Sequence, residues 1–420
     1  MQSSWSADVL FVAYGGGHAQ MVTPVIKALG DRARIAVLAL PSAIAHFRRS
    51  NIPALTFADL LDPTTDQNAL AWGEALAQQH HADHTGIARS QSVAYLGLSY
   101  ADLVGRLGSS EAEARMARMG RHAFHPITVL DRALDLVQPR VVVATNSPRA
   151  EAAAIEAGNL RGLSTLSMTD VFMAMKHHRN QAQDITYLNR FAMENLARIG
   201  IVNPDRSQAH FTGNPAFDAL FKTPAASDRA WQAAEFPDAK DKPVFLFADM
   251  VSWVEAGTNA SHTQTEAQVA AQLEACADAA EQAGVILAIR PHPSQDPGPH
   301  ERIVSERAAC VLARHQPLHD LLRNVEGVIA RSSTVALETV ILRQKLLQLE
   351  PDKHPDMPLA SLGTAWGVPE MSELAQVIET ALADTTEWRS IKSRIEHHFP
   401  AQIASEAIAD LILHRLEQAS

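Results

Sequence analysis

Three hydroxyl-bearing residues follow an apolar run in the C-terminal half of the chain. Residues 327–330 are short, apolar and partly β-branched, as expected of a buried parallel strand. Ser332, Ser333 and Thr334 come next, and residues of these types cap helix N-termini. Such a turn directs free backbone N–H groups at the space above the sheet, where they and the helix dipole favour an anion. We predict a phosphate-binding turn, with Glu338 one helical turn further on to accept hydrogen bonds from sugar hydroxyls. The alternative is a plain helix cap with a solvated glutamate.

A histidine between two prolines follows another apolar run in the same half. Residues 285–290 predict a strand that ends at Arg290, and Pro291-His292-Pro293 comes directly after it. The prolines fix the backbone around the histidine. As an imidazolium, His292 would hydrogen-bond a leaving phosphate. We predict that His292 takes part in the chemistry and that Arg290 contacts the same ligand. The alternative is a rigid loop whose histidine is incidental.

Three glycines and a histidine follow the first apolar run of the chain, residues 8–14. Gly15, Gly16 and Gly17 permit positive φ angles and a close approach of the backbone to a ligand. Their spacing is not the G-x-G-x-x-G of dinucleotide-binding folds. His18 and Asp170, which both follow predicted strands, are candidate bases for an acceptor hydroxyl. Each could instead cap an adjoining helix or turn.

The chain also contains patterns that resemble metal sites. His80 and His84 have the i, i+4 spacing of metal ligands on a helix, but the H-E-x-x-H pattern is absent. A solvated or substrate-lining histidine face is therefore the favoured interpretation. No Asp-x-Asp pair ends a predicted strand, since Asp249 stands alone before Met250. We predict a protein without a metal requirement.

Length and composition restrict the function further. A chain of 420 residues, 46% hydrophobic and 20% charged, predicts a globular protein of two or more domains. A net charge of −11 argues against a broad nucleic-acid surface. Cys276 and Cys310 are the only cysteines, which fits a reducing compartment. The short polar start at residues 1–7 is not typical of a signal peptide, and no apolar run approaches a membrane span. We expect a cytoplasmic protein.

Alternating strand and helix patterns indicate how these residues are positioned. Residues 34–40 and 54–57 predict two further strands after the first, which gives the βαβαβ start of a doubly wound sheet. Residues 69–137 have a helical pattern. The other strands of the first half are predicted at 140–145, 163–167, 184–188 and 209–212. Those of the second half are predicted at 244–249, 285–290, 309–312, 327–330 and 345–349, with a loop over 350–369.

The composition of residues 223–243, rich in Pro, Ala, Asp and Lys, is typical of a linker. We predict a Rossmann-like domain over 1–222, a linker over 223–242, a second Rossmann-like domain over 243–395 and a closing helix over 396–420. Two such α/β domains facing each other would form a cleft lined by loops from the carboxyl ends of both sheets.

These signatures, in this order, resemble the GT-B superfamily of nucleotide-sugar enzymes over nearly the whole chain. The Gly-Gly-Gly-His loop and Thr212-Gly213-Asn214-Pro215 with Asp218 are similar to segments of the lipid II-forming N-acetylglucosaminyltransferase and of UDP-N-acetylglucosamine 2-epimerases. The His-Pro and Ser-Ser pair resembles that of bacterial sialyltransferases, capsule Kdo transferases and teichoic-acid glycerophosphotransferases. In those families the pair binds the nucleotide phosphate of a CMP- or CDP-activated donor.

The sequence departs from the families in three places. The epimerases have acidic catalytic residues after a GLxT-like segment, whereas here Gly162-Leu163-Ser164-Thr165 leads to Asp170 and no Glu. Their His-Arg-Arg motif is also missing, because residues 245–252 read FLFADMVS. The long glycine-rich donor loop of the lipid II-forming enzyme is absent as well.

The resemblance implies a metal-independent glycosyltransferase of cell-surface glycan synthesis without a cofactor. Its nucleotide-sugar donor (CMP-, CDP- or UDP-linked) would bind the C-terminal half, with Asn214 as a further donor contact. Its glycan or lipid-linked acceptor would bind the N-terminal half, and a peripheral membrane contact stays open. Two alternatives are an epimerase-like nucleotide-sugar enzyme and a non-catalytic nucleotide-sugar binding protein.

Overall fold

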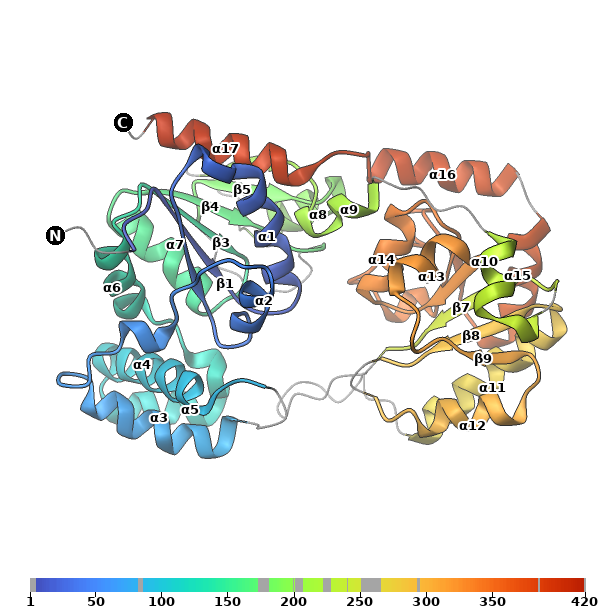
Figure 1. Cartoon of the computed structure of the whole chain (residues 1–420), viewed down its shortest axis with the longest axis horizontal. Helices are drawn as coiled ribbons and strands as arrows, with labels where there is room; N and C mark the ends of the chain where they lie inside the picture. Colours follow the sequence, from blue (N-terminus) through green and yellow to red (C-terminus); the bar gives the residue numbers. More distant parts are fainter. Residues whose placement is uncertain are drawn as a thin grey trace. The chain divides into compact units, whose positions relative to one another are not determined.

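The computed structural model contains two six-stranded parallel sheets with helices on their faces (Figure 1). It describes residues 5–81, 86–172, 181–198, 200, 207–221, 228–239, 241–250, 266–292, 295–383 and 386–418. One compact unit comprises Met1–Asp218 with Gln402–Ser420, and the other comprises Ala219–Ala401. This confirms the predicted α/β architecture with two Rossmann-like domains. Within the described ranges, no helix is long and apolar enough to cross a membrane.

The first sheet has the strand order β2-β1-β3-β4-β5-β6. Its strands are β1 (Val9–Ala13), β2 (Ile35–Ala39), β3 (Val141–Thr145), β4 (Ser164–Met168), β5 (Asp184–Tyr187) and β6 (Gln208–Phe211). Every neighbouring pair is parallel. Because β1 pairs with both β2 and β3, the order reverses beside β1, and a doubly wound sheet binds ligands at such a point.

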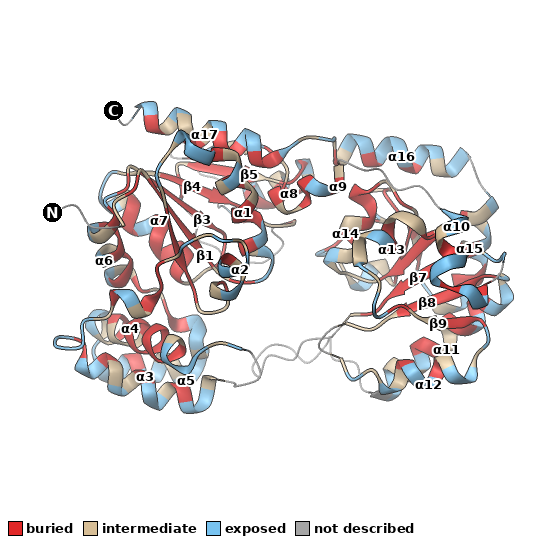
Figure 2. Ribbon diagram, in the orientation of Figure 1, coloured by how far each residue is buried: buried red, intermediate tan, exposed pale blue. Residues whose placement is uncertain are grey.

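Successive residues of the central strands belong to two different cores, one on each face of the sheet. Val9 and Phe11 of β1 pack in one core with α1 (Gly17–Leu29) and α17 (Ala404–Gln418). Leu10 and Val12 pack in the other with α6 (Ile127–Val137) and α7 (Ala150–Leu160). Burial on both faces explains why these strands are continuous apolar runs (Figure 2).

The helical pattern predicted over residues 69–137 is confirmed, and the short strand predicted just before it is wrong. The helices of this stretch are α3 (Gln67–His80), α4 (Arg89–Leu107), α5 (Ser109–Met119) and α6. Within 54–57, only Leu55 forms an isolated bridge, to Leu38. The chain then turns away because Thr56 and Asp59 form a capping box around a 3₁₀ helix.

The second sheet has the order β12-β11-β10-β7-β8-β9. Its strands are β7 (Val244–Ala248), β8 (Ile286–Arg290), β9 (Cys310–Leu312), β10 (Gly327–Ala330), β11 (Leu346–Leu349) and β12 (Trp366–Val368). β12 lies within residues 350–369, which we expected to be a loop. This expectation fails because the strand is only three residues long and is held by tertiary contacts, including stacking of Trp366 on Trp388.

The remaining helices surround the sheets of their own units. Those of ten or more residues in the second unit are α11 (Glu266–Gln282), α15 (Leu374–Ala383) and α16 (Thr386–His398). Helix α10 (Arg229–Glu235) lies inside the stretch predicted as a linker, and Asp228 caps it by accepting hydrogen bonds from the N–H groups of Ala230 and Trp231. The second unit therefore has ordered structure well before residue 243.

The C-terminal helix α17 belongs to the first unit and packs against α1 (Figure 1). Asp218, which follows the Thr212-Gly213-Asn214-Pro215 segment, caps the N-terminus of α17. The two carboxylate oxygens accept hydrogen bonds from the N–H groups of Ala404 and Ser405 at 2.8 and 2.9 Å. Near the other end of α17, Arg415 forms a bidentate ion pair with buried Asp184. The motif's aspartate thus fastens the helix that closes the first unit.

We expect Asp218→Ala to loosen α17. The substitution leaves two N–H groups at the start of the helix without acceptors, so the free energy of unfolding should fall by about 1–2 kcal/mol. Amide hydrogen exchange in α17 should accelerate, because the contacts that hold the helix weaken. Asp228→Ala, which removes the cap of α10 instead, is the matched control and should leave exchange in α17 unchanged. Equal exchange in α17 for Asp218→Ala and the native protein would refute this role.

Candidate functional site

In the first unit, the chemically active candidates gather at the carboxyl ends of three adjacent strands. His18 follows β1, Thr145 is the last residue of β3, and Asp170 follows β4. This is the edge at which the strand order reverses, between β1 and β3. The sequence predicted that His18 and Asp170 follow strands, and the topology brings their loops together.

The glycine loop that precedes His18 is shaped by its own surroundings. A Cβ atom on Gly15 would lie 2.5 Å from the carbonyl oxygen of Ser42, so only glycine fits there. Gly16 has a φ of 65°, which glycine adopts without strain. The close backbone approach expected for a ligand is therefore made by Ser42 at Gly15. Helix α1 begins at Gly17 and places His18 in its first turn.

His18 is the first member of a chain of hydrogen bonds that leads to a buried carboxylate. Its Nδ1 lies 2.5 Å from Thr145 Oγ1, and the Thr145 hydroxyl donates to Glu151 Oε1. The same Glu151 oxygen accepts the N–H of Tyr14 at 2.9 Å. Because the Thr145 proton is used on Glu151, Nδ1 must donate to Thr145, which leaves the lone pair of His18 on Nε2. Nε2 has no hydrogen-bond partner among the described residues.

The electrostatics of this pair favour a basic histidine. Burial disfavours the imidazolium, but the hydrogen bonding and the charge of Glu151 outweigh it and raise the pKa of His18 above its ordinary value of 6.5. Burial likewise opposes ionisation of Glu151, yet contacts with His18, Thr145 and the Tyr14 N–H lower its pKa. The side chain of His18 is 21% exposed while that of Glu151 is fully buried. The histidine can therefore meet a ligand while the carboxylate stays protected from solvent.

Glu151 is not among the site residues predicted from the sequence. A signal was present, because Glu151 is a charged residue in the first turn of an otherwise alanine-rich helix that follows a buried strand. Sequence spacing could not pair Glu151 with His18, because 133 positions separate the two residues. They meet only because β1 and β3 are neighbours in the sheet.

Asp170, the second candidate base, is engaged with Asn146. The Asn146 side chain donates to Asp170 Oδ1 at 3.1 Å and accepts the Asp170 N–H at 3.2 Å. The negative charge of Asp170 also contributes to the raised pKa of His18. Asp170 thus faces the same edge as His18, and its role as a base stays a prediction.

In the second unit, the predicted phosphate turn has the expected local structure. β10 ends at Ala330, and the Ser333 side chain caps α14 (Thr334–Ile341) by accepting the N–H of Ala336. Ser332 and Thr334 flank this cap. β10 adjoins β7 at the point where the order of the second sheet reverses, so the turn occupies the corresponding ligand-binding edge.

Two neighbours of this turn have partners that the sequence did not predict. Arg331 forms an ion pair with Glu350 at 3.1 Å, which joins the turn to the end of β11. Glu338 lies 3.0 Å from His319 Nε2 rather than standing alone. A sugar hydroxyl that reached Glu338 would therefore meet a carboxylate already held in place by a histidine.

We expect Ser333→Ala and Thr334→Ala each to weaken nucleotide binding more than they weaken the fold. Losing the cap costs about 1 kcal/mol of stability, whereas losing a hydrogen bond to a charged phosphate costs about 1.5–3 kcal/mol of binding. Calorimetric titration with the nucleotide that binds the native protein measures the second quantity. Unchanged affinity in both variants would show that this turn does not bind the nucleotide phosphate.

His292 lies at the same edge of the second sheet, on a loop braced by buried polar groups. The backbone N–H of His292 donates to Gln295 Oε1 at 2.7 Å, and the Gln295 side-chain amide donates to Asp249 Oδ2 at 3.0 Å. His300, almost fully buried, lies 2.8 Å from the same Asp249 oxygen. Asp249, which the sequence showed as an isolated acidic residue after β7, is thus an anchor of the His292 loop. Pro293 lies outside the described residues.

Two residues predicted to contact the nucleotide-sugar donor form hydrogen bonds within the protein. Arg290 donates from Nη1 to the carbonyl oxygens of Ala313 and Gln316 at 3.0 and 2.8 Å, which holds the loop after β9. The side chain of Asn214 is buried and accepts the N–H of Ala216. Their participation in donor binding stays a prediction.

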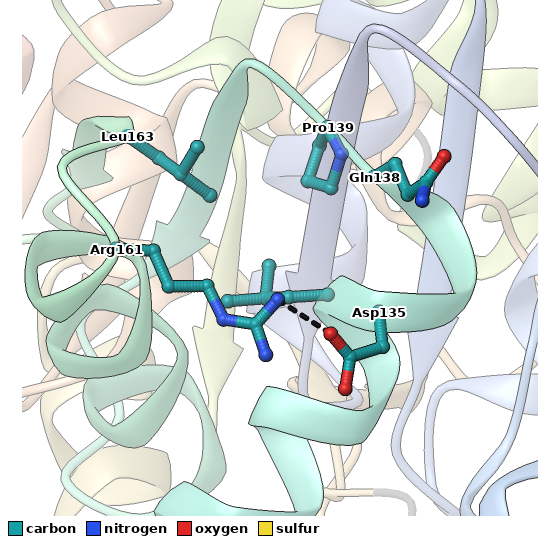
Figure 3. Close-up of a pocket in the computed structure, with 6 residues that line it drawn as sticks. Asp135, Gln138, Pro139, Arg161 and Leu163 are labelled. Atoms are coloured by element: carbon teal, nitrogen blue, oxygen red, sulfur yellow. Dashed lines mark hydrogen bonds and ion pairs between the residues drawn. The ribbon is translucent and has the colours of Figure 1, made fainter.

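The described part of the chain holds no group of three or more His, Cys, Asp and Glu side chains that could bind a metal. His84 lies outside it, so the His80 and His84 pair stays untested. A small pocket opens at the opposite edge of the first sheet, where Pro139 precedes β3 and Leu163 precedes β4 (Figure 3). Its arginine, Arg161, is already paired with Asp131 and Asp135. This pocket is separate from the His18 edge.

Comparison with known proteins confirms the fold. No protein-family model and no curated protein matches the sequence. Among solved structures, a UDP-N-acetylglucosamine 2-epimerase of Listeria monocytogenes is similar at 15% identity and a TM-score of 0.60, with 98% of each chain covered. The epimerase of Neisseria meningitidis bound to UDP-GlcNAc has 13% identity and a TM-score of 0.60 over 98% of this chain and 99% of that one. The glycosyltransferase SnogD of Streptomyces nogalater has 14% identity and a TM-score of 0.52 over 96% and 98%. The chain has the two-domain GT-B fold that these enzymes share.

Proposed function

We propose that this protein is a metal-independent glycosyltransferase that moves a sugar from a nucleotide-activated donor to an acceptor hydroxyl. The observation that carries this proposal is the His18–Thr145–Glu151 chain. It provides a partly exposed histidine whose Nε2 lone pair is not used within the hydrogen-bond chain, with a buried carboxylate behind it. A positioned base of this kind is what an acceptor hydroxyl requires.

The proposed sugar transfer takes place in a single step. The acceptor O–H loses its proton to His18 Nε2 as the acceptor oxygen bonds to the anomeric carbon of the sugar. The bond from that carbon to the donor phosphate oxygen breaks, and the nucleotide leaves with the negative charge. Thr145 and Glu151 stabilise the resulting imidazolium, because the carboxylate interacts more strongly with the charged ring than with the neutral one.

On the donor side, the proposal uses the edge of the second sheet. Hydroxyl and N–H groups around Ser333 would hold the phosphate, and His292 would donate a hydrogen bond to the departing charge. These groups replace the cation that many nucleotide-sugar enzymes use. The similar structures include complexes with UDP-GlcNAc and UDP, which supports a nucleotide-sugar as the ligand.

The experiment has two stages. A thermal-shift screen with CMP, CDP, UDP, GDP and dTDP identifies the nucleotide, since a ligand that binds only the folded state raises Tm. The matching sugar donor is then incubated with the protein and candidate acceptors in EDTA. We expect glycoside formation in EDTA. Activity that EDTA abolishes and magnesium or manganese restores would contradict metal independence, and failure to turn over any donor would favour a non-catalytic binding protein.

A 2-epimerase is the second candidate function. It is favoured by the higher TM-scores of the epimerase structures, 0.60 against 0.52 for SnogD. Glu151, buried beside His18, also supplies a glutamate, which the loop after Thr165 lacks. The two reactions differ in their products, because an epimerase changes the donor sugar without any acceptor.

A further inference from the structure

Several buried polar atoms without hydrogen-bond partners gather near His18. Among the described residues, the Nε of Arg149, the hydroxyl of Tyr95 and Oε2 of Glu151 are buried and unpartnered. Tyr95 is only 6% exposed, and it lies on α4 between Phe57 and Phe124. Leaving such groups unpaired is costly, so clusters of them are typical of sites completed by a ligand or water.

Arg149 is the positively charged member of this group. It precedes α7 directly, with its guanidinium 5.2 Å from the centre of the Tyr14 ring. The His18 ring lies 6.1 Å from the same Tyr14 ring, edge to face. Arg149 and His18 therefore lie against the same aromatic ring.

The charges around Tyr95 come from two arginines and from Glu151. Burial raises the pKa of the Tyr95 hydroxyl, the guanidinium groups of Arg149 and Arg121 oppose the rise, and the carboxylate of Glu151 adds to it. Arg149 makes no ion pair with a carboxylate within the ranges that the structure describes, unlike Arg161 at the other end of α7, which pairs with Asp131 and Asp135. The N-terminus of α7 adds the positive end of its dipole beside Arg149.

We propose that Arg149, together with the hydroxyls of Tyr14 and Tyr95, binds an anionic group of the acceptor and thereby presents the acceptor hydroxyl to His18. The group is a carboxylate or a phosphate on a sugar. A guanidinium with a free Nε–H suits the two oxygens of either group. A hexuronic acid or a hexose phosphate carries such a group within a few ångströms of its hydroxyls. The inference rests on the proposed transfer function and names the class of its acceptor.

Binding of three matched probes tests the proposal. Methyl β-D-glucuronide, glucose 6-phosphate and methyl β-D-glucoside carry a carboxylate, a phosphate and no charge. Affinities are measured by ligand-observed NMR with the full chain. The native protein should bind at least one anionic probe about tenfold more tightly than the neutral one, as expected for a charge-assisted hydrogen bond. The identity of the preferred probe decides between carboxylate and phosphate.

Variants connect this preference to the cluster. Arg149→Met should abolish the preference, and Arg149→Lys should retain part of it because the charge remains without the fork. Arg161→Met, at the other end of the same helix, is the matched control and should keep the full preference. Tyr14→Phe, which keeps the ring that Arg149 and His18 contact, should reduce anionic affinity severalfold and serves if Arg149→Met does not fold.

Two results overturn the proposal. One is equal binding of the charged and neutral probes by the native protein, including no binding of any probe. The other is an anionic preference that persists in both Arg149→Met and Tyr14→Phe. Nucleotide-induced Tm shifts and transfer in the same samples separate this inference from the proposed function. Transfer without anionic preference sinks only the acceptor assignment, whereas anionic preference without nucleotide binding or transfer sinks the glycosyltransferase.

Discussion

His18→Ala should lower kcat for sugar transfer by about 10²–10⁴-fold, the usual contribution of a general base. The loss arises because His18 is the only group described at this edge that combines a free lone pair, on Nε2, with a hydrogen-bond chain to a buried carboxylate. Nucleotide affinity should stay near the native value, since the nucleotide is expected on the second unit. Steady-state kinetics with saturating donor, together with a nucleotide titration, measures both quantities.

The control is His46→Ala. His46 lies 2.8 Å from Thr23 of α1 and has no place in the proposed step, so its loss should leave kcat within a few-fold of native. A folded His18→Ala protein with near-native kcat would remove His18 as the base and return the role to Asp170.

The pH dependence of kcat/KM distinguishes a catalytic role of the His18–Glu151 pair from a purely structural one. The raised pKa of His18 places the ascending limb of the pH–kcat/KM profile above pH 6.5, because the base acts only when neutral. Glu151→Gln preserves the shape of the side chain and removes its charge, so the limb should shift to lower pH while the maximal rate falls. An unchanged limb would show that Glu151 does not tune the base.

His292→Ala should lower kcat by on the order of 10²-fold or more while changing KM little. The proposed hydrogen bond from His292 to the donor phosphate should strengthen as the bond to the sugar breaks, so we expect the substitution to affect chiefly the transition state. The loop should survive the substitution, because Gln295 accepts the backbone N–H of His292 and is itself bound to Asp249. Kinetics on the folded variant, verified by its Tm, tests the assignment.

His315→Ala serves as the comparison for His292. His315 is an exposed histidine after the next strand, β9, and should tolerate truncation without loss of turnover. Near-normal turnover in a well-folded His292→Ala protein would mean that this histidine only packs, leaving the Ser333 turn as the sole support for a donor phosphate site.

The sequence revealed the features that depend on local chemistry. Buried parallel strands appear as apolar runs, and the cap at Ser333 was predictable because capping depends on a few consecutive residues. The class of fold followed from the alternation of such elements, and the structural comparisons agree with it.

Features that depend on tertiary pairing were not predictable. Glu151 meets His18 only because β1 and β3 are neighbours, and Asp218 caps a helix that begins nearly two hundred residues later in the chain. The three residues of β12 are too few for a periodic pattern. The predicted strand at 54–57 failed because the Thr56 and Asp59 capping box outweighs its β propensity.

A proton NMR time course of the purified chain in EDTA tests the proposed sugar transfer most directly. The donor is the sugar derivative of the nucleotide that gives the largest Tm shift, supplied with and without the preferred sugar acceptor. We expect a new glycosidic anomeric signal and release of the nucleotide, both dependent on the acceptor and both lost in His18→Ala. Conversion of the donor sugar into its C2 epimer with no acceptor present would contradict it and establish the epimerase instead.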